Sequence, residues 1–278
     1  MLGGIAALWL GARARVRPSG TAVGRVTVPL AGLPTALDGL AIQVVADLHV
    51  RSHRSPGLRA LDELAGLQPD FLFACGDLVD DADATPLVAR ALAAIEPRHG
   101  AYAVWGNHDL MAPPKVTDPG WIGVRAQPLN FMREAFQARG ITLLDNARVE
   151  HQINGEVVAI AGVGDATERR DDAKQALCGA DDDVFTLVLT HNPDATPRLG
   201  ASRVDLVVCG HTHGGQIVPV LMPPVTTSTR LLLRRPAGLV HIGGRLVFIT
   251  RGIGTVGIPL RINAPAEAPV LTLVRVGS

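Results

Sequence analysis

Asp, His and Asn residues directly follow short apolar runs at several places in this chain of 278 residues. In residues 204–215, a run of apolar and β-branched residues ends at Gly210, and His211 and His213 follow with one residue between them. A strand end is rigid, and the glycines beyond it leave room for a ligand to approach the backbone closely. Two neutral imidazoles held in this way suit a metal ion. Taken alone, this pair of histidines fits an exposed loop equally well.

The same arrangement recurs after the apolar runs at 41–46, 71–75, 101–104 and 184–189. A role in a turn would account for any one of the polar residues there. Open α/β sheets, however, bind their ligands at the carboxyl ends of strands, and these strand ends carry only Asp, Asn and His side chains. The candidate site residues are Asp47, His49, Asp77, Asn107, His108, Asp109, His191, His211 and His213.

Oxygen and imidazole donors without thiolates suit Mn²⁺, Fe, Zn²⁺ or Mg²⁺. The candidates are more than one ion needs, so we expect two divalent metal ions as cofactors. The three cysteines form no C-x-x-C pair and have no zinc-finger spacing. Their odd number also argues against a disulfide framework.

The elements that must position these residues alternate between strand and helix in the first half of the chain. Helical patterns at 56–67 and 85–95 separate the first three apolar runs, and an Asn154-Gly155 pair marks a later β-hairpin. This order predicts an α/β fold whose sheets mix parallel and antiparallel strands. The chain contains no repeat or internal linker, so we expect a single domain over residues 23–278, preceded by a short apolar and basic segment at 1–22.

The N-terminal segment has two interpretations. Residues 1–10 are apolar and an arginine cluster follows at 13–17, but the apolar stretch is too short to span a bilayer and is a poor signal peptide. It fits a short interfacial anchor with a basic flank, and it fits a frayed terminus equally well. Arginines after an apolar stretch favour a cytoplasmic domain, in contact with the cytoplasmic face of the inner membrane if the anchor interpretation holds.

The charge of the chain is unevenly distributed. The net charge is zero, so no nucleic acid polymer is expected as a partner. Residues 214–278 nevertheless contain seven arginines and one acid, Glu267, and residues 217–233 are apolar and proline-rich. A basic face would suit an anionic substrate or an anionic lipid surface, whereas arginines scattered over the surface would have no such meaning. Arg251 fits either contact with an anion or a structural salt link.

The motifs occur in the order D-x-H (47–49), G-D-x-x-D (76–80), G-N-H-D (106–109), T-H (190–191) and G-H-T-H-G-G (210–215). In this order they resemble those of the calcineurin-like metallophosphoesterases, most of all the bacterial subgroup similar to YkuE and YaeI. The resemblance runs from about residue 26 to near the end of the chain. It implies the metallo-dependent phosphatase fold, a four-layer αββα sandwich of two mixed β-sheets flanked by helices.

The resemblance also implies roles for the site residues. One metal ion would be held by Asp47, His49, Asp77 and His213, and the other by Asp77, Asn107, His191 and His211. Asp77 would bridge the two ions. His108 would lie near the leaving group, and Asp109 would orient it.

The expected activity is that of a dinuclear metal-dependent phosphohydrolase, most consistent with a phosphodiesterase or pyrophosphatase that uses metal-activated hydroxide. A lipid-linked phosphoester substrate at the membrane surface would explain the apolar N-terminus, the apolar stretch at 217–233 and the basic C-terminal third. A soluble nucleotide phosphodiesterase is the alternative, and a non-catalytic metal-binding scaffold on the same fold is a third hypothesis. The substrate, the metal pair and the oligomeric state stay open at this stage.

Overall fold

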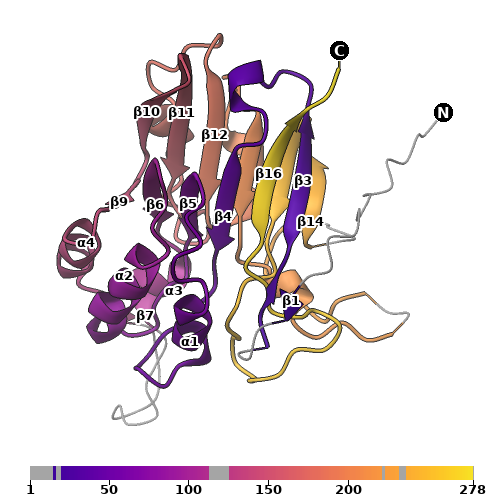
Figure 1. The fold of residues 1–278 in the computed structure, drawn as a ribbon. Coiled ribbons are helices and arrows are strands. Elements are labelled where there is room, and N and C mark those ends of the chain that lie inside the picture. The colour runs from indigo at the N-terminus through magenta and orange to yellow at the C-terminus, as the bar shows by residue number, and fades with distance from the viewer. Residues whose placement is uncertain (1–14, 17–19, 113–124, 221–222, 232–235, 278) are drawn as a thin grey trace.

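Two six-stranded sheets form the centre of the protein in a computed structural model that describes residues 15–16, 20–112, 125–220, 223–231 and 236–277 (Figure 1). The first sheet has the order β3 (Arg25–Leu30), β16 (Val270–Arg275), β4 (Ala41–Val45), β5 (Phe71–Cys75), β6 (Gly100–Val104) and β9 (Ile141–Leu143). The second has the order β10 (Ala147–Ile153), β11 (Glu156–Val163), β12 (Phe185–Thr190), β13 (Leu206–Cys209), β15 (Arg245–Ile249) and β14 (Gly238–Ile242).

Both sheets are mixed, as the strand and hairpin patterns predict. In the first, β4, β5, β6 and β9 are parallel, and β16 is antiparallel to β4 but parallel to β3. In the second, β11, β12, β13 and β15 are parallel, and hairpins add β10 and β14 at the two edges. Two short antiparallel ladders, β1 (Arg15–Val16) with β2 (Ala22–Val23) and β7 (Met111–Ala112) with β8 (Arg125–Ala126), complete the described strands.

The inner strands are buried on both faces, which explains their continuous apolar runs. Successive side chains of a strand point to opposite faces of its sheet. Leu72 and Ala74 of β5 therefore join the core beneath the helices, whereas Phe71 and Phe73 join the core between the two sheets. On β13, Leu206 and Val208 face the core between the sheets, and Val207 and Cys209 face the outer side of the second sheet.

Helices cover the outer faces of both sheets. Three of them, α1 (Pro56–Asp62), α2 (Thr85–Ala93) and α4 (Leu129–Gln137), pack on the first sheet (Figure 1). The second sheet is covered by the short helix α5 (Ala173–Ala176) and the 3₁₀ segment Pro193–Arg198. The 3₁₀ segment contains Pro197, which has no backbone N–H to donate to an α-helical ladder. The resulting layers confirm the predicted αββα sandwich.

The ends and surface loops bear on two further expectations. Most of the N-terminal segment 1–22, interpreted from the sequence as a membrane-associating tail, lies outside the described residues. Within the described ranges, no helix has the length and apolar character needed to cross a bilayer. The remaining short helices are α3 (Asn107–Leu110) and the 3₁₀ turns Thr35–Leu37, Ala82–Ala84 and His213–Gly215.

Candidate metal centre

The carboxyl ends of parallel strands from both sheets meet at one end of the sandwich. Asp47 and His49 follow β4, Asp77 follows β5, and Asn107 and His108 begin the short helix α3 after β6. The second sheet contributes His191 after β12 and His211 and His213 after β13. The sheet edges thus bring together side chains that are far apart in the sequence, as the strand-end motifs predict.

The backbone at these strand ends is unusual. Positive φ angles, between 50° and 69°, occur at five of these residues: Asp47, His49, Asp77, His211 and His213. Residues other than glycine rarely adopt this region. Strained backbone of this kind clusters at functional sites, where the surrounding structure holds it in place.

Glycines allow the buried carboxylates to be approached closely. A Cβ atom at Gly106 would overlap the Asp77 carboxylate, and a Cβ atom at Gly252 would overlap the Asp47 carboxylate. At these two positions, glycine is required by the space that each carboxylate occupies.

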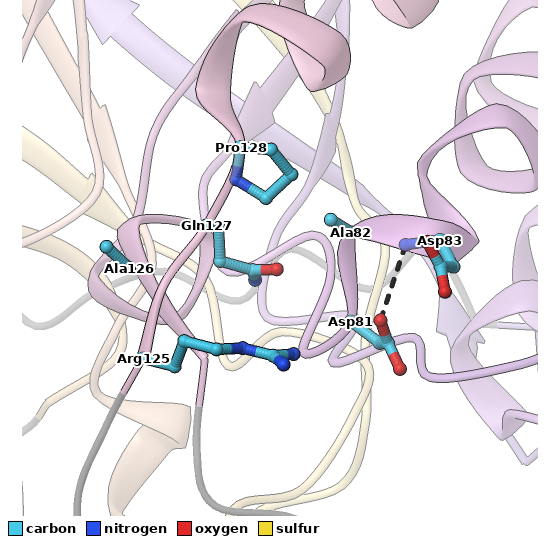
Figure 2. A pocket seen from close by; sticks show the side chains of 7 residues that line it. All are labelled: Asp81, Ala82, Asp83, Arg125, Ala126, Gln127 and Pro128. Atoms are coloured by element: carbon cyan, nitrogen blue, oxygen red, sulfur yellow. Dashed lines mark hydrogen bonds between the residues drawn. The ribbon is translucent and has the colours of Figure 1, made fainter.

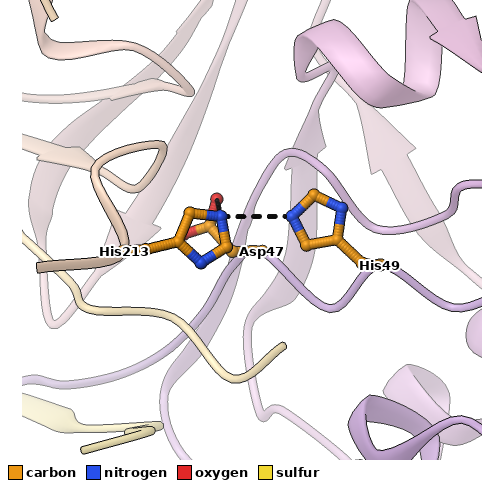
Figure 3. A group of neighbouring side chains, drawn as sticks. All are labelled: Asp47, His49 and His213. Atoms are coloured by element: carbon orange, nitrogen blue, oxygen red, sulfur yellow. Dashed lines mark hydrogen bonds and ion pairs between the residues drawn. The ribbon is translucent and has the colours of Figure 1, made fainter. Parts of the chain in front are cut away.

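The first group of ligand atoms comprises Asp47, His49 and His213 (Figure 3). His49 Nε2 lies 3.2 Å from His213 Nε2, and His213 Nε2 lies 3.7 Å from an Asp47 oxygen. All three side chains are buried. Figure 3 shows the two imidazoles facing each other with the carboxylate of Asp47 beside them.

The second group comprises Asp77, His191 and His211. His191 Nε2 lies 3.3 Å from Asp77 Oδ2 and 3.0 Å from His211 Nδ1. The same Asp77 oxygen is 3.7 Å from His49 Nε2, so this carboxylate lies between the two groups. The role of Asp77 as the bridging residue stays a prediction, for which this position is required.

Oxygen acceptors fix the orientation of three imidazoles. His191 Nδ1 donates to the carbonyl of Cys75 at 2.8 Å, His211 Nε2 donates to the carbonyl of Ser228 at 2.6 Å, and His49 Nδ1 donates to Asp80 at 2.9 Å. Such bonds define which ring nitrogen keeps its proton and leave the other nitrogen, here the one facing the site, free to bind a metal ion.

Asn107 provides a direct test of whether a metal ion fits. Its Oδ1 is buried and has no hydrogen-bond partner among the described residues. A buried amide oxygen without a partner is costly, and a divalent cation would satisfy it. Together with the imidazoles and carboxylates of the two groups, this oxygen makes a donor set that suits Mn²⁺, Fe, Zn²⁺ or Mg²⁺.

His108 is oriented by Asp80, which corrects the expectation that Asp109 would do so. His108 Nδ1 lies 2.7 Å from Asp80 Oδ1, the oxygen that also contacts His49. The carboxylate of Asp109 instead accepts backbone N–H groups, those of Leu78, Val79 and Gly106, each at 2.9 Å. Adjacent residues at the start of α3 point in different directions, so sequence adjacency does not bring Asp109 to the His108 ring.

The electrostatics of the two carboxylates differ. Burial raises the pKa of Asp47, and the negative charge of Asp77 raises it further. Burial also opposes ionisation of Asp77, but the charge and hydrogen bond of His191 outweigh this and hold the pKa of Asp77 well below its usual value. Cations near both carboxylates would therefore stabilise the site.

The pKa values of the histidines of the centre are also shifted in opposite directions. Burial lowers the pKa of His191, but Asp77 and Asp47 outweigh burial and raise it well above the usual value. Burial and the neighbouring His191 lower the pKa of His211 to about 4, and burial, His49 and Arg261 lower the pKa of His213. His211 and His213 are thus neutral at pH 7, whereas a metal ion would displace the proton of His191.

A cavity of about 480 Å³ opens beside the loop that follows Asp80 (Figure 2). Its lining residues are Asp81, Ala82, Asp83, Arg125, Ala126, Gln127 and Pro128. Figure 2 shows the Arg125 side chain extending toward the loop of Asp81 and Asp83. Gln127 connects this cavity to the centre, because its Nε2 donates to the carbonyl of His108 at 2.9 Å.

Sequence reasoning missed several residues that support the centre. Asp80 is the second acid of the G-D-x-x-D motif, a signal that was available, and its other oxygen binds Arg51 Nε at 2.8 Å. Arg261 is far in the sequence from every strand-end motif, yet its guanidinium contacts His213. The sequence left two interpretations of Arg251, contact with an anion or a structural salt link. The structure shows the salt link, since Arg251 pairs with the buried Glu267.

Comparison with known proteins decides the family. The model of the family described as calcineurin-like phosphoesterase matches residues 40–215, which include every predicted ligand. The chain belongs to this family. The family uses a dinuclear divalent metal centre, and the two His and Asp groups fit such a centre. The prediction that this chain is an enzyme that hydrolyses phosphoester bonds is therefore confirmed.

Similar proteins come from bacteria and animals. The phosphoesterase is 30% identical to an uncharacterized metallophosphoesterase of Aquifex aeolicus, over 96% of this chain and 97% of that protein. It is 29% identical to the phosphodiesterase YaeI of Escherichia coli, over 84% of this chain and 82% of that protein. It is also 28% identical to a zebrafish (Danio rerio) transmembrane protein with a metallophosphoesterase domain, over 89% of this chain but only 56% of that protein.

Proposed function

We propose that this phosphoesterase is a dinuclear enzyme that hydrolyses phosphodiester or pyrophosphate bonds. The observation that supports the proposal is the position of the Asp77 carboxylate, whose Oδ2 lies 3.7 Å from His49 Nε2 and 3.3 Å from His191 Nε2. The proposed ligands are Asp47, His49, Asp77 and His213 for one ion, and Asp77, Asn107, His191 and His211 for the other. The ions are Mn²⁺, Fe, Zn²⁺ or Mg²⁺, the cations that this donor set suits.

Bound divalent ions supply charge that polarises a phosphoryl group and activates water. His108 supplies the proton in this proposal. Its Nδ1 is held by Asp80, so its Nε2 is free to donate to the oxygen of the leaving group. Burial lowers the pKa of His108, but the hydrogen bond to Asp80 and the charges of Asp77 and Asp80 outweigh burial and raise it to about 9. The imidazole is therefore protonated at pH 7 and ready to act as a general acid.

Asp109 supports this machinery from the backbone. By accepting the N–H groups of Leu78 and Val79, its carboxylate fixes the turn between the ligand Asp77 and the orienting residue Asp80. We therefore assign Asp109 a positioning role.

The finer proposal concerns a lipid-linked substrate. Exposed apolar side chains gather in two neighbouring loops, which we term the apolar rim: Val220, Val225, Val256, Ile258, Leu260 and Ile262. Val220 exposes 77% of its surface and Ile258 exposes 59%. Exposed apolar side chains that form a contiguous surface indicate an interaction site, and we propose that the apolar rim is such a surface.

The apolar rim borders the metal centre. Gln216 follows His213 by three residues, and its Nε2 donates to the carbonyls of Val256 and Ile258, each at 3.0 Å. Ile217 and Ile262 form a β-bridge that joins the two loops. An acyl chain on the rim would therefore place an attached phosphoester near the ligands. With the basic C-terminal third and the apolar N-terminus, this supports a cytoplasmic enzyme that contacts the membrane surface.

The alternative is an enzyme that acts on soluble nucleotide diesters and does not contact lipid. A non-catalytic scaffold is the third candidate, but the family's ligand motifs are all present, which disfavours it. Hydrolysis separates enzyme from scaffold, and liposome binding separates the two kinds of enzyme.

The hydrolysis experiment uses purified protein that has been stripped of metal. Bis-p-nitrophenyl phosphate and p-nitrophenyl phosphate are each supplied with and without Mn²⁺, and His108→Ala is assayed in parallel. We expect Mn²⁺-dependent cleavage that favours the diester and is largely lost in H108A while metal content is retained. Equal turnover by H108A would contradict the acid role, and two bound ions without hydrolysis of either ester would favour the scaffold.

A further inference from the structure

The segment from Thr250 to Glu267 lies outside the region matched by the family, residues 40–215, yet it passes directly behind the metal ligands. The backbone N–H of Gly254 donates to the carbonyl of Asp47 at 2.6 Å. Gly252 packs so closely on the Asp47 carboxylate that a side chain would not fit there. This C-terminal segment is therefore part of the wall of the centre.

Arg261 holds the C-terminal segment together. Its guanidinium donates to three main-chain carbonyls of the segment: Nε to Gly254 at 3.0 Å, Nη1 to Ala264 at 3.1 Å and Nη2 to Arg251 at 2.9 Å. No carboxylate contacts this guanidinium among the described residues. A planar fork of donors can join several carbonyls at once, whereas the ammonium of lysine is a single point of charge.

The same guanidinium reaches His213. Nη1 donates to the carbonyl of His213 at 3.2 Å, and Nη2 lies 3.3 Å from Nδ1 of its ring. His213 begins a 3₁₀ turn with a positive φ angle of 50°, followed by Gly214 at 62°, so its backbone conformation is not favoured locally. The other three ligand imidazoles have an oxygen acceptor at the outer nitrogen, whereas His213 has a guanidinium donor there, so the contact that holds His213 in place is the one to its main-chain carbonyl.

We propose that Arg261 is the positioning residue of His213, so that the C-terminal segment sets the affinity of the ion held by Asp47, His49 and His213. The inference rests on the proposed ligand set. It does not depend on the substrate or on turnover. Without the guanidinium donors of Arg261, the His213 backbone relaxes from its strained conformation, and the ring no longer faces Asp47 and His49.

The test is the binding of Mn²⁺ alone, at buffered free concentrations, with bound metal measured by mass spectrometry. Arg261→Met removes the donors, and Arg261→Lys keeps the charge without the fork. The matched control is Arg245→Met, because Arg245 also donates to a main-chain carbonyl, that of Gly200, but at a distance from the centre. We expect both Arg261 variants to bind one ion about 10- to 100-fold more weakly and the other as in the wild type. R245M binds both as in the wild type.

A double variant tests whether Arg261 acts through His213. In a His213→Asn background, which weakens the same ion directly, R261M is expected to cause no further loss. A further loss, wild-type binding by R261K, or equal weakening of both ions by R261M would each overturn the proposal. Circular dichroism of the metal-free proteins checks the fold, and R261K carries the comparison if R261M does not fold. A wild type that binds fewer than two ions would instead contradict the proposed function.

Discussion

Asp80 Oδ1 lies 2.7 Å from His108 Nδ1, on the side of the ring opposite the nitrogen that would face a leaving group. The carboxylate has only 5% of its side chain exposed, and the imidazole 18%, so the pair is shielded from water at one end and open at the other. Asp80 also contacts His49, a proposed ligand, with the same oxygen. One carboxylate thus couples the proposed acid to the metal centre.

Asp80→Asn is expected to lower turnover by about 10- to 100-fold, since the orientation and proton affinity of His108 both depend on this carboxylate. Phenyl phosphodiesters should lose more activity than p-nitrophenyl phosphodiesters, because the poorer leaving group needs the proton more. Steady-state kinetics with both esters checks this, and metal analysis separates it from any effect through His49. An equal loss for both esters would show that Asp80 does not act through proton donation.

The pH profile of turnover should have an alkaline limb near pH 9. The pKa of His108 is raised to about 9, so the proton needed by the leaving group is present below that pH and is lost as the pH rises through it. In D80N the hydrogen bond that raises this pKa is weakened, and the limb moves to lower pH. Turnover in H108A should have no such limb. A limb at the same pH in H108A would assign it to another group.

Asp109→Ala is expected to destabilise the protein. The substitution leaves the buried N–H groups of Leu78, Val79 and Gly106 without their acceptor, and a buried unsatisfied group costs about 1–3 kcal/mol. Urea unfolding of metal-free protein measures the loss. Unchanged stability would contradict the positioning role that we assign to Asp109.

Asn107→Ala is expected to remove one metal ion without weakening the metal-free protein. The buried Oδ1 of Asn107 has no hydrogen-bond partner among the described residues, so the substitution breaks no hydrogen bond to that oxygen. Asn146→Ala is the matched control, because Asn146 Oδ1 accepts the N–H groups of Gly164 at 2.8 Å and Asp172 at 3.0 Å. N146A should unfold at a lower temperature and keep both ions. Two tightly bound ions in N107A would remove Asn107 from the ligand set.

Substitution of the apolar rim should reduce binding to lipid. Val225→Ser and Ile258→Ser together are expected to lower co-sedimentation with vesicles that contain anionic phospholipid, while cleavage of bis-p-nitrophenyl phosphate is unchanged. Val157→Ser is the control, since Val157 is an exposed apolar residue of β11 outside the rim loops. If wild-type protein does not bind these vesicles, the soluble-enzyme alternative is favoured.

The layers of the fold and the convergence of the strand ends were predictable because both depend on local pattern. Apolar runs of four to six residues mark buried strands, and parallel strands bring their carboxyl ends to one edge. The short 3₁₀ cover of the second sheet was less predictable, since Pro197 lies inside it and so short a segment has no helical period to detect.

The contacts that support the ligands could not be read from spacing in the same way. Asp109 is next to His108 in sequence, yet its carboxylate points to the backbone of the preceding loop, and the ring contacts a carboxylate 28 residues earlier. Arg261 is 48 residues from His213, in a loop without regular structure. Such contacts depend on how separate loops pack together, and a single sequence has no periodicity that reports this.

The order of strands in the first sheet has a consequence for how the protein is made. β16 lies between β3 and β4, although it is synthesised long after both of them. While the nascent chain leaves the ribosome, β4 therefore has an open edge, and edge strands are places where chains aggregate or where chaperones bind. Closing this gap joins distant parts of the chain, which is a slow kind of step. The ligands Asp47 and His49, which follow β4, therefore belong to a strand that lacks one of its two neighbours until β16 has been translated.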